Sequence, residues 1–141
     1  MKHMREGLWQ GDSGDLKALL SREVRDKLRF TLIVNVGHSP YLPLDVQTVY
    51  FPMQDSDAWK DNDWDRAVYY VRLVYDEIRR RQGKVLVVCD AGLSRSVVFC
   101  GMVMSLLTRN RMSEPKLKQK LMNPFVMEGL WQNAAEAMEF V

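Results

Sequence analysis

The residues best suited to chemistry stand together in one run of this 141-residue chain, Cys89-Asp90-Ala91-Gly92-Leu93-Ser94-Arg95-Ser96. Apolar residues dominate positions 84–88 before the run and 96–107 after it, which predicts a buried strand, a loop and a buried helix. A loop that leads into a helix N-terminus presents backbone N–H groups without internal partners, and these groups bind anions together with the helix dipole. The pattern therefore predicts an anion-binding loop with a cysteine at its start.

The side chains of this run suit phosphate as the anion and cysteine as the nucleophile. Gly92 lets the backbone curl so that successive N–H groups face inward, and Arg95 adds a planar pair of donors for phosphate oxygens. The same positive field stabilises a thiolate at Cys89, and Ser96 could donate to that thiolate when it leaves. We therefore expect Cys89, Arg95 and Ser96 to be catalytic. Phosphate would be bound by Asp90, Ala91, Gly92, Leu93, Ser94 and Arg95.

A cysteine at the end of a core strand can also be buried and inert, as free cysteines commonly are. For Cys89, the arginine six residues later, the glycine and the strand–loop–helix context favour the functional interpretation. Cys100 lacks such neighbours and is predicted to be a core residue of the following helix.

Cleavage of a phosphate ester also calls for an acid that protonates the leaving oxygen. Asp55 follows the alternating run 46–51, a predicted strand, and lies 34 residues before Cys89 on a polar loop that could fold over the site. Asp57 is the alternative. We predict Asp55 as the general acid, and expect the later aspartates of this loop to be solvated or to cap the next helix.

Strand-like and helix-like patterns alternate along the chain, with no repeat or low-complexity stretch. This predicts one α/β domain over residues 1–141, with a central, mostly parallel sheet of four to five strands flanked by helices. The ordered part is expected to begin at Leu8. Strands are predicted at Leu8–Trp9, 31–36, 46–51 and 84–88, and helices at 15–28, 64–82, 96–107, from Ser113 (as cap, with Pro115 in the first turn) and over 130–141.

The composition is that of an ordinary globular protein, with 47% hydrophobic and 27% charged residues. The net charge of +2 is too small to indicate nucleic acid or a membrane surface as the main partner. Two cysteines and two histidines have neither zinc-site spacing nor the number for a disulfide framework. The chain starts without the apolar core of a signal peptide. We expect a cytoplasmic monomer without a metal or other cofactor.

The segment from Cys89 to Ser96 resembles the signature of the dual-specificity protein phosphatases, a family of the protein tyrosine phosphatase superfamily. The resemblance extends over most of the chain. Segments similar to the family are Gly7-Leu8-Trp9-Gln10-Gly11 (its opening strand and turn), Leu32-Ile33-Val34-Asn35-Val36 (its next core strand), Phe51-Pro52-Met53-Gln54-Asp55 (ending in its general acid) and Asn123 to Phe140 (its C-terminal helices).

The resemblance implies hydrolysis of phosphotyrosine and phosphoserine or phosphothreonine in phosphorylated proteins, through a phosphocysteine on Cys89 and without a metal. It also implies a shallow cleft that accepts all three residues. One departure is Val88, because the family usually has a histidine directly before the nucleophile, where it helps to fix the loop and activate the thiol. We therefore expect Cys89 to ionise less readily, or the rate to be lower, than in a typical member.

Several alternatives remain. Val88 leaves room for a pseudophosphatase that binds phosphoproteins without turnover. A rhodanese-type sulfurtransferase also uses a cysteine at the start of an anion-binding loop, but would not need the loop around Asp55. Low-molecular-weight tyrosine phosphatases place their signature at the N-terminus. Phosphoinositides are disfavoured by the acidic Asp90, and RNA 5′-phosphates by the lack of a basic patch.

Overall fold

The computed structural model describes residues 1–141 and contains five strands, six α-helices and one 3₁₀ helix. The strands are β1 (Lys2–Arg5), β2 (Leu8–Gly11), β3 (Leu32–Asn35), β4 (Gln47–Tyr50) and β5 (Val85–Val88). The helices are α1 (Ser13–Ala18), α2 (Arg22–Leu28), η1 (Trp59–Asp61), α3 (Trp64–Arg79), α4 (Arg95–Thr108), α5 (Pro115–Leu121) and α6 (Glu128–Ala137).

All strands form one sheet in the order β1-β2-β5-β3-β4, in which every neighbouring pair is parallel except β1 and β2. β5, which leads to Cys89, is therefore the central strand. A central strand covered on both faces needs apolar residues at every position, which explains its unbroken apolar sequence. The arrangement confirms the predicted α/β fold with a mostly parallel sheet flanked by helices.

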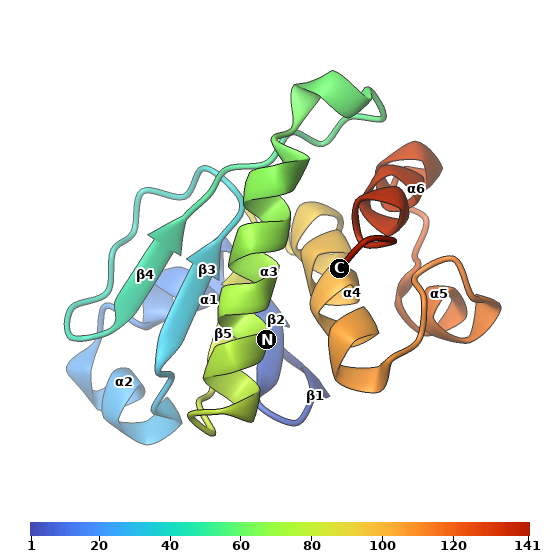
Figure 1. The fold of residues 1–141 in the computed structure, drawn as a ribbon. Helices are drawn as coiled ribbons and strands as arrows, with labels where there is room; N and C mark the ends of the chain where they lie inside the picture. Colours follow the sequence, from blue (N-terminus) through green and yellow to red (C-terminus); the bar gives the residue numbers. More distant parts are fainter.

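Helices cover both faces of the sheet (Figure 1): α3 and α4 lie on one face, with α5 and α6 beyond α4, and α1 and α2 lie on the other. Alternate residues of β5 divide between the two faces. Val85 and Val87 join the large cluster under α3 and α4, whereas Leu86 and Val88 join a smaller cluster with the α1 side. The smaller cluster consists of Leu16, Leu19, Phe30, Ile33, Leu86 and Val88.

α4 is the buried centre of the helical layer, and it directs its N-terminus at the loop after β5. A Cβ on Gly101 would lie 2.9 Å from the ring of Trp131, so α4 and α6 approach closely at this glycine. The Trp131 Nε1–H donates to the Met112 carbonyl at 2.9 Å, which satisfies the polar edge of this buried ring. Cys100 is fully buried in the same layer, as predicted, and burial raises the pKa of its thiol.

Two expected elements are wrong in outline. The helix predicted over 15–28 is in fact two short helices. The chain breaks between them because Ser21 is the N-cap of the second helix, where its hydroxyl accepts from the Val24 N–H at 3.4 Å. The ordered chain also begins before Leu8, since β1 pairs antiparallel with β2. β1 was missed because its sequence is polar and only Met4 is buried.

Helix ends differ from the predictions by a few residues. Asp12 caps α1 and forms a capping box with Asp15, and Asp63 caps α3 as expected. α3 ends at Arg79 rather than near Gln82, and α6 ends at Ala137 instead of continuing to residue 141. Ser113 does not cap α5; Glu114 occupies the cap position without a side-chain bond. No helix has the length and apolar character needed to cross a bilayer.

Candidate active site

The loop between β5 and α4, residues 89–94, forms a turn whose backbone donors are free. None of the N–H groups of residues 90–94 donates to an acceptor in the protein. Gly92 has φ +70°, and a Cβ there would lie 3.0 Å from Asp12 Cβ and 3.1 Å from the Gly11 carbonyl oxygen, so this position requires glycine. Consecutive free amides at the start of a helix form a cradle for an anion.

Cys89 lies at the base of this turn and is 2% exposed. Its Sγ is 3.1 Å from the Ser96 Oγ in the first turn of α4. Gln10, buried at the end of β2, donates from Nε2 to the Ser96 Oγ at 2.8 Å and to the Gly92 carbonyl at 2.6 Å. Because Gln10 donates to the Ser96 oxygen, the Ser96 hydroxyl proton is left to point at the sulfur.

Arg95, at the start of α4, has most of its donors held by the protein. Nη2 donates to the Asp90 carboxylate at 3.0 Å, and Nη1 donates to the Met53 carbonyl at 3.4 Å. Nη1 also lies 3.3 Å from His38 Nδ1, which accepts in the tautomer protonated at Nε2. Of the five N–H groups of an arginine, this leaves Nε–H and one Nη2–H free to donate to an anion.

Asp90 is fixed from two sides, since the His38 backbone N–H donates to its Oδ1 at 2.8 Å while Oδ2 accepts from Arg95. Partial burial acts to raise the pKa of Asp90, but the hydrogen bond from the His38 backbone and the hydrogen bond and charge of Arg95 outweigh it and hold the pKa below its usual value. The Asp90 side chain therefore orients Arg95, and only the backbone N–H of Asp90 is available to an anion.

The turn after β3 packs directly on the start of the loop. A Cβ on Gly37 would lie 2.7 Å from Asp90 Oδ1 and 3.0 Å from Cys89 Cα. Asn35 holds this turn, because its amide donates to the Ser39 carbonyl and its Oδ1 accepts from the Gly37 N–H, each at 3.0 Å. Asn35 thus braces the loop through its own turn rather than by direct contact.

The structure brings Asp55, and not Asp57, to the loop. The Ser94 hydroxyl donates to Asp55 Oδ1 at 2.8 Å. Asp57, two residues later, has its backbone against α6, where its carbonyl accepts from the Asn133 amide at 3.0 Å. Of the two candidate acids, Asp55 is therefore the one in contact with the predicted phosphate loop.

The fold is similar to those of solved protein phosphatases. Human DUSP28 superposes with a TM-score of 0.72 at 22% identity, over 96% of this chain and 94% of that one. The human tyrosine phosphatase-like serine/threonine/tyrosine-interacting protein gives 0.76 at 19% identity, over 96% and 93%. OH1 from the Orf virus, a tyrosine phosphatase with triple substrate specificity, gives 0.70 at 22% identity, over 96% and 83%.

The chain has the dual-specificity phosphatase fold. No protein-family profile matches the sequence, and no curated protein matches it in a sequence search. The similarity lies in the path of the chain. The loop that begins with Cys89 follows the central strand and precedes a buried helix, as the sequence predicts.

Within this dual-specificity phosphatase fold, Val88 is fully buried and points away from the loop into the smaller apolar cluster. Leu16 and Ile33 belong to the same cluster, so an apolar side chain stands where the family usually carries a histidine. The thiol of Cys89 is instead contacted on the other side by Ser96.

Gln10 and His38 were not predicted as site residues. A signal for Gln10 existed: strand alternation places it on the same buried face as Leu8, where a polar side chain needs a partner. His38 follows a strand whose end neighbours Cys89 in a parallel sheet, but the sequence does not reveal that its backbone would bind Asp90.

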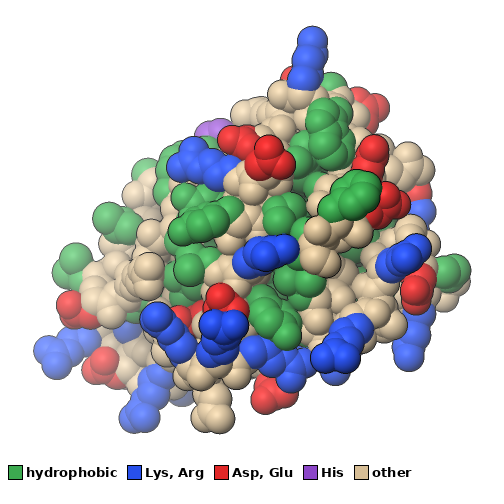
Figure 2. Space-filling model, viewed as in Figure 1, with side chains coloured by type: hydrophobic (Ala, Val, Ile, Leu, Met, Phe, Trp, Pro, Cys, Tyr) green, Lys and Arg blue, Asp and Glu red, His purple; other side chains and the backbone are tan.

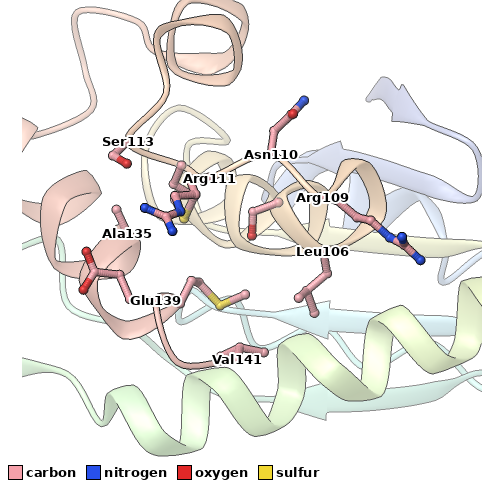
Figure 3. Close-up of a pocket in the computed structure, with 11 residues that line it drawn as sticks. Leu106, Arg109, Asn110, Arg111, Ser113, Ala135, Glu139 and Val141 are labelled. Carbon is pink, nitrogen blue, oxygen red and sulfur yellow. The ribbon is translucent and has the colours of Figure 1, made fainter.

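A separate cavity of about 270 Å³ lies between the end of α4 and α6 (Figure 3). Arg109, Arg111 and Glu139 are among the residues that line it. It shares no residue with the loop from Cys89 to Arg95 or with residues 51–63 between β4 and α3, the acid-bearing loop that contains Asp55.

Proposed function

We propose that this protein is a phosphoprotein phosphatase that hydrolyses phosphotyrosine and phosphoserine or phosphothreonine through a phosphocysteine on Cys89. One observation carries the proposal: the Cys89 thiol lies at the base of five consecutive free amides, residues 90–94, beside the free N–H groups of Arg95. That arrangement suits the three non-bridging oxygens of a phosphoryl group, with sulfur below the phosphorus. The substrates we propose are phosphorylated cytoplasmic proteins, and the protein acts as a monomer.

In the first step, the Cys89 thiolate attacks phosphorus in line with the leaving oxygen. The S–P bond forms as the P–O bond to the substrate side chain breaks. The loop amides and Arg95 hold the equatorial oxygens, where negative charge is spread in the transition state. Asp55, protonated and held near the loop by Ser94, gives its proton to the departing oxygen.

In the second step, Asp55, now a carboxylate, takes a proton from a water molecule that attacks the phosphocysteine. The O–P bond forms as the S–P bond breaks, and inorganic phosphate leaves. The Ser96 hydroxyl, 3.1 Å from the sulfur, stabilises the thiolate as it departs. Gln10 holds Ser96 in the required orientation by donating to its oxygen.

The test is hydrolysis of p-nitrophenyl phosphate by the purified protein and by Cys89→Ser. We expect turnover by the wild type, its loss by at least about 10³-fold in Cys89→Ser, and a covalent phosphoprotein when the wild type is quenched during turnover. Cys100→Ala is the control, because it removes the other thiol without touching the site, and should retain activity. Equal rates for wild type and Cys89→Ser would contradict the proposal.

A second candidate function is a phosphoprotein-binding module without turnover. Val88 favours it, because an apolar side chain stands where the family usually has a histidine that helps to activate the thiol. In that case phosphopeptides would bind stoichiometrically to the wild type, Arg95→Ala would abolish binding, and no phosphate would be released over hours.

A further inference from the structure

α6 lies beside the acid-bearing loop at the upper edge of the molecule (Figure 1). Two of its residues, Gly129 and Asn133, contact Asp57 in that loop. They are four positions apart, so they lie on the same face of the helix one turn from each other. Both contacts are to the main chain or the Cβ of Asp57. They therefore fix the backbone of the loop and do not depend on the end of a flexible side chain.

The contact at Gly129 leaves no room for a side chain. A Cβ there would lie 2.5 Å from Asp57 Cβ and 3.4 Å from Asp57 Cα. Gly129 is the second residue of α6, in its first turn. Its lack of a side chain lets the loop come close to the helix at this position.

The acid-bearing loop is also held from its other sides. Ser94 of the phosphate loop donates to Asp55 at 2.8 Å, and the Trp64 Nε1–H donates to the Trp59 carbonyl at 3.1 Å. The segment before α6 reaches the phosphate loop as well, since the Asn123 amide donates to the Leu93 carbonyl at 3.0 Å. The C-terminal segment thus touches both loops that a two-step phosphoryl transfer would use.

We propose that Gly129 and Asn133 are positioning residues that hold the acid-bearing loop against α6, and so keep Asp55 at the phosphate loop. The inference rests on the proposed function, in which Asp55 is the proton donor. Asp57, two residues from Asp55, is the anchor point. Neither Gly129 nor Asn133 would touch the substrate.

A misplaced acid has a characteristic kinetic signature. A good leaving group such as p-nitrophenolate departs without much help, whereas an unsubstituted phenolate needs its proton. Variants that displace Asp55 should therefore lose kcat/KM on phenyl phosphate while largely keeping it on p-nitrophenyl phosphate. A variant that only loosens the fold would lower both rates together.

The experiment compares Gly129→Ala and Asn133→Ala with Gln132→Ala on both substrates. Gln132 is the matched control, an exposed amide on the same helix with no hydrogen bond to the loop. We expect Gly129→Ala to lose about tenfold or more on phenyl phosphate, since small misplacements of a catalytic group are costly, and less than about threefold on p-nitrophenyl phosphate. Asn133→Ala should show the same pattern more weakly, and Gln132→Ala none.

The Asp55→Asn background separates a positioning effect from a structural one. If Gly129 acts through Asp55, adding Gly129→Ala to Asp55→Asn should cause no further loss on phenyl phosphate. A full additional loss, an equal loss on both substrates, or identical behaviour of Gly129→Ala and Gln132→Ala would each overturn the inference.

A second readout does not depend on turnover. Amide hydrogen exchange at Ala58 and Asp61, whose N–H groups bond within the loop, should accelerate in Gly129→Ala and Asn133→Ala but not in Gln132→Ala. Unchanged exchange in all three would overturn the positioning role whether or not the wild type is a phosphatase. If the wild type shows no turnover but exchange is accelerated in the variants, the proposed function is overturned. The result would still support the conclusion that Gly129 and Asn133 hold the acid-bearing loop.

Discussion

The functional side chains at this site are fixed by hydrogen-bond partners, of which those of Ser96 and Asp55 are distant in the sequence and that of Arg95 lies in the same loop. Ser96 is oriented by Gln10, Arg95 by Asp90 and Asp55 by Ser94. The motif itself could be found from sequence, because Cys, Gly and Arg at that spacing after an apolar run have few other uses. Gln10 and His38 could not be assigned, since their roles depend on which strands and turns become neighbours.

Asp90 supplies a prediction about acid stability. Its pKa is lowered in the folded state, so its ion pair contributes stability above the unfolded value near 3.8, and this contribution is lost as pH falls below that value. Asp90→Asn should therefore lower the free energy of unfolding at pH 7 by about 1 kcal/mol or less, because the partly exposed pair is screened by solvent. Urea unfolding at pH 7 and pH 3 measures it.

The difference between Asp90→Asn and wild type should be smaller at pH 3 than at pH 7, because the unfolded chain takes up the Asp90 proton over this range more readily than the folded protein does. Asp65→Asn serves as the control, since it removes an exposed carboxylate of the neighbouring helix that makes no ion pair. A difference that stays constant with pH would contradict the assignment of the ion pair.

Elements were easier to predict than their ends. The strand before Cys89 and the helix after it were predicted because both are buried and nearly all apolar. Such a segment can be recognised in the sequence without knowing which elements pack against it. The break between α1 and α2 was missed, since Leu16, Leu19, Val24 and Leu28 keep helical spacing across it and only the Ser21 cap marks it. β1 was missed because an edge strand needs little apolar sequence.

The two faces of β5 give a prediction at Val88. Because Val88 is fully buried in the smaller apolar cluster, Val88→His should place a polar imidazole in a largely apolar environment. We expect the free energy of unfolding to fall by about 1–3 kcal/mol, measured by urea denaturation. Val88→Ile, which keeps the face apolar, is the control. A histidine variant as stable as wild type would show that the smaller cluster can supply a partner.

Across the molecule, charge is unevenly distributed. Lys and Arg side chains gather along the lower edge of the face in Figure 2, where α3 ends, far from the acid-bearing loop at the top. Residues 55–66, that loop and the start of α3, carry five aspartates, Asp55, Asp57, Asp61, Asp63 and Asp65, against two basic residues, Lys60 and Arg66. The surroundings of the candidate site are therefore negative, although the whole chain has a net charge of +2.

This distribution predicts a preference among substrates. Phosphopeptides with Lys or Arg beside the phosphorylated residue should have a higher kcat/KM than the same peptides with Asp or Glu there, because they approach a negative rim. The advantage should decrease as salt is raised from about 0.05 M to 0.5 M, since screening shortens the reach of surface charges. Equal rates for basic and acidic peptides at low salt would contradict it.

The anion cradle of residues 90–94 is made of main-chain N–H groups. In evolutionary terms, such a cradle constrains the backbone conformation of the loop and puts little constraint on its side chains. Gly92 is tied to its position by its left-handed φ and its contact with Gly11, whereas Ala91 and Leu93 are free to change with the substrate. Most of the sequence, and with it the substrate preference, could therefore change during evolution while the anion cradle of the backbone stays the same.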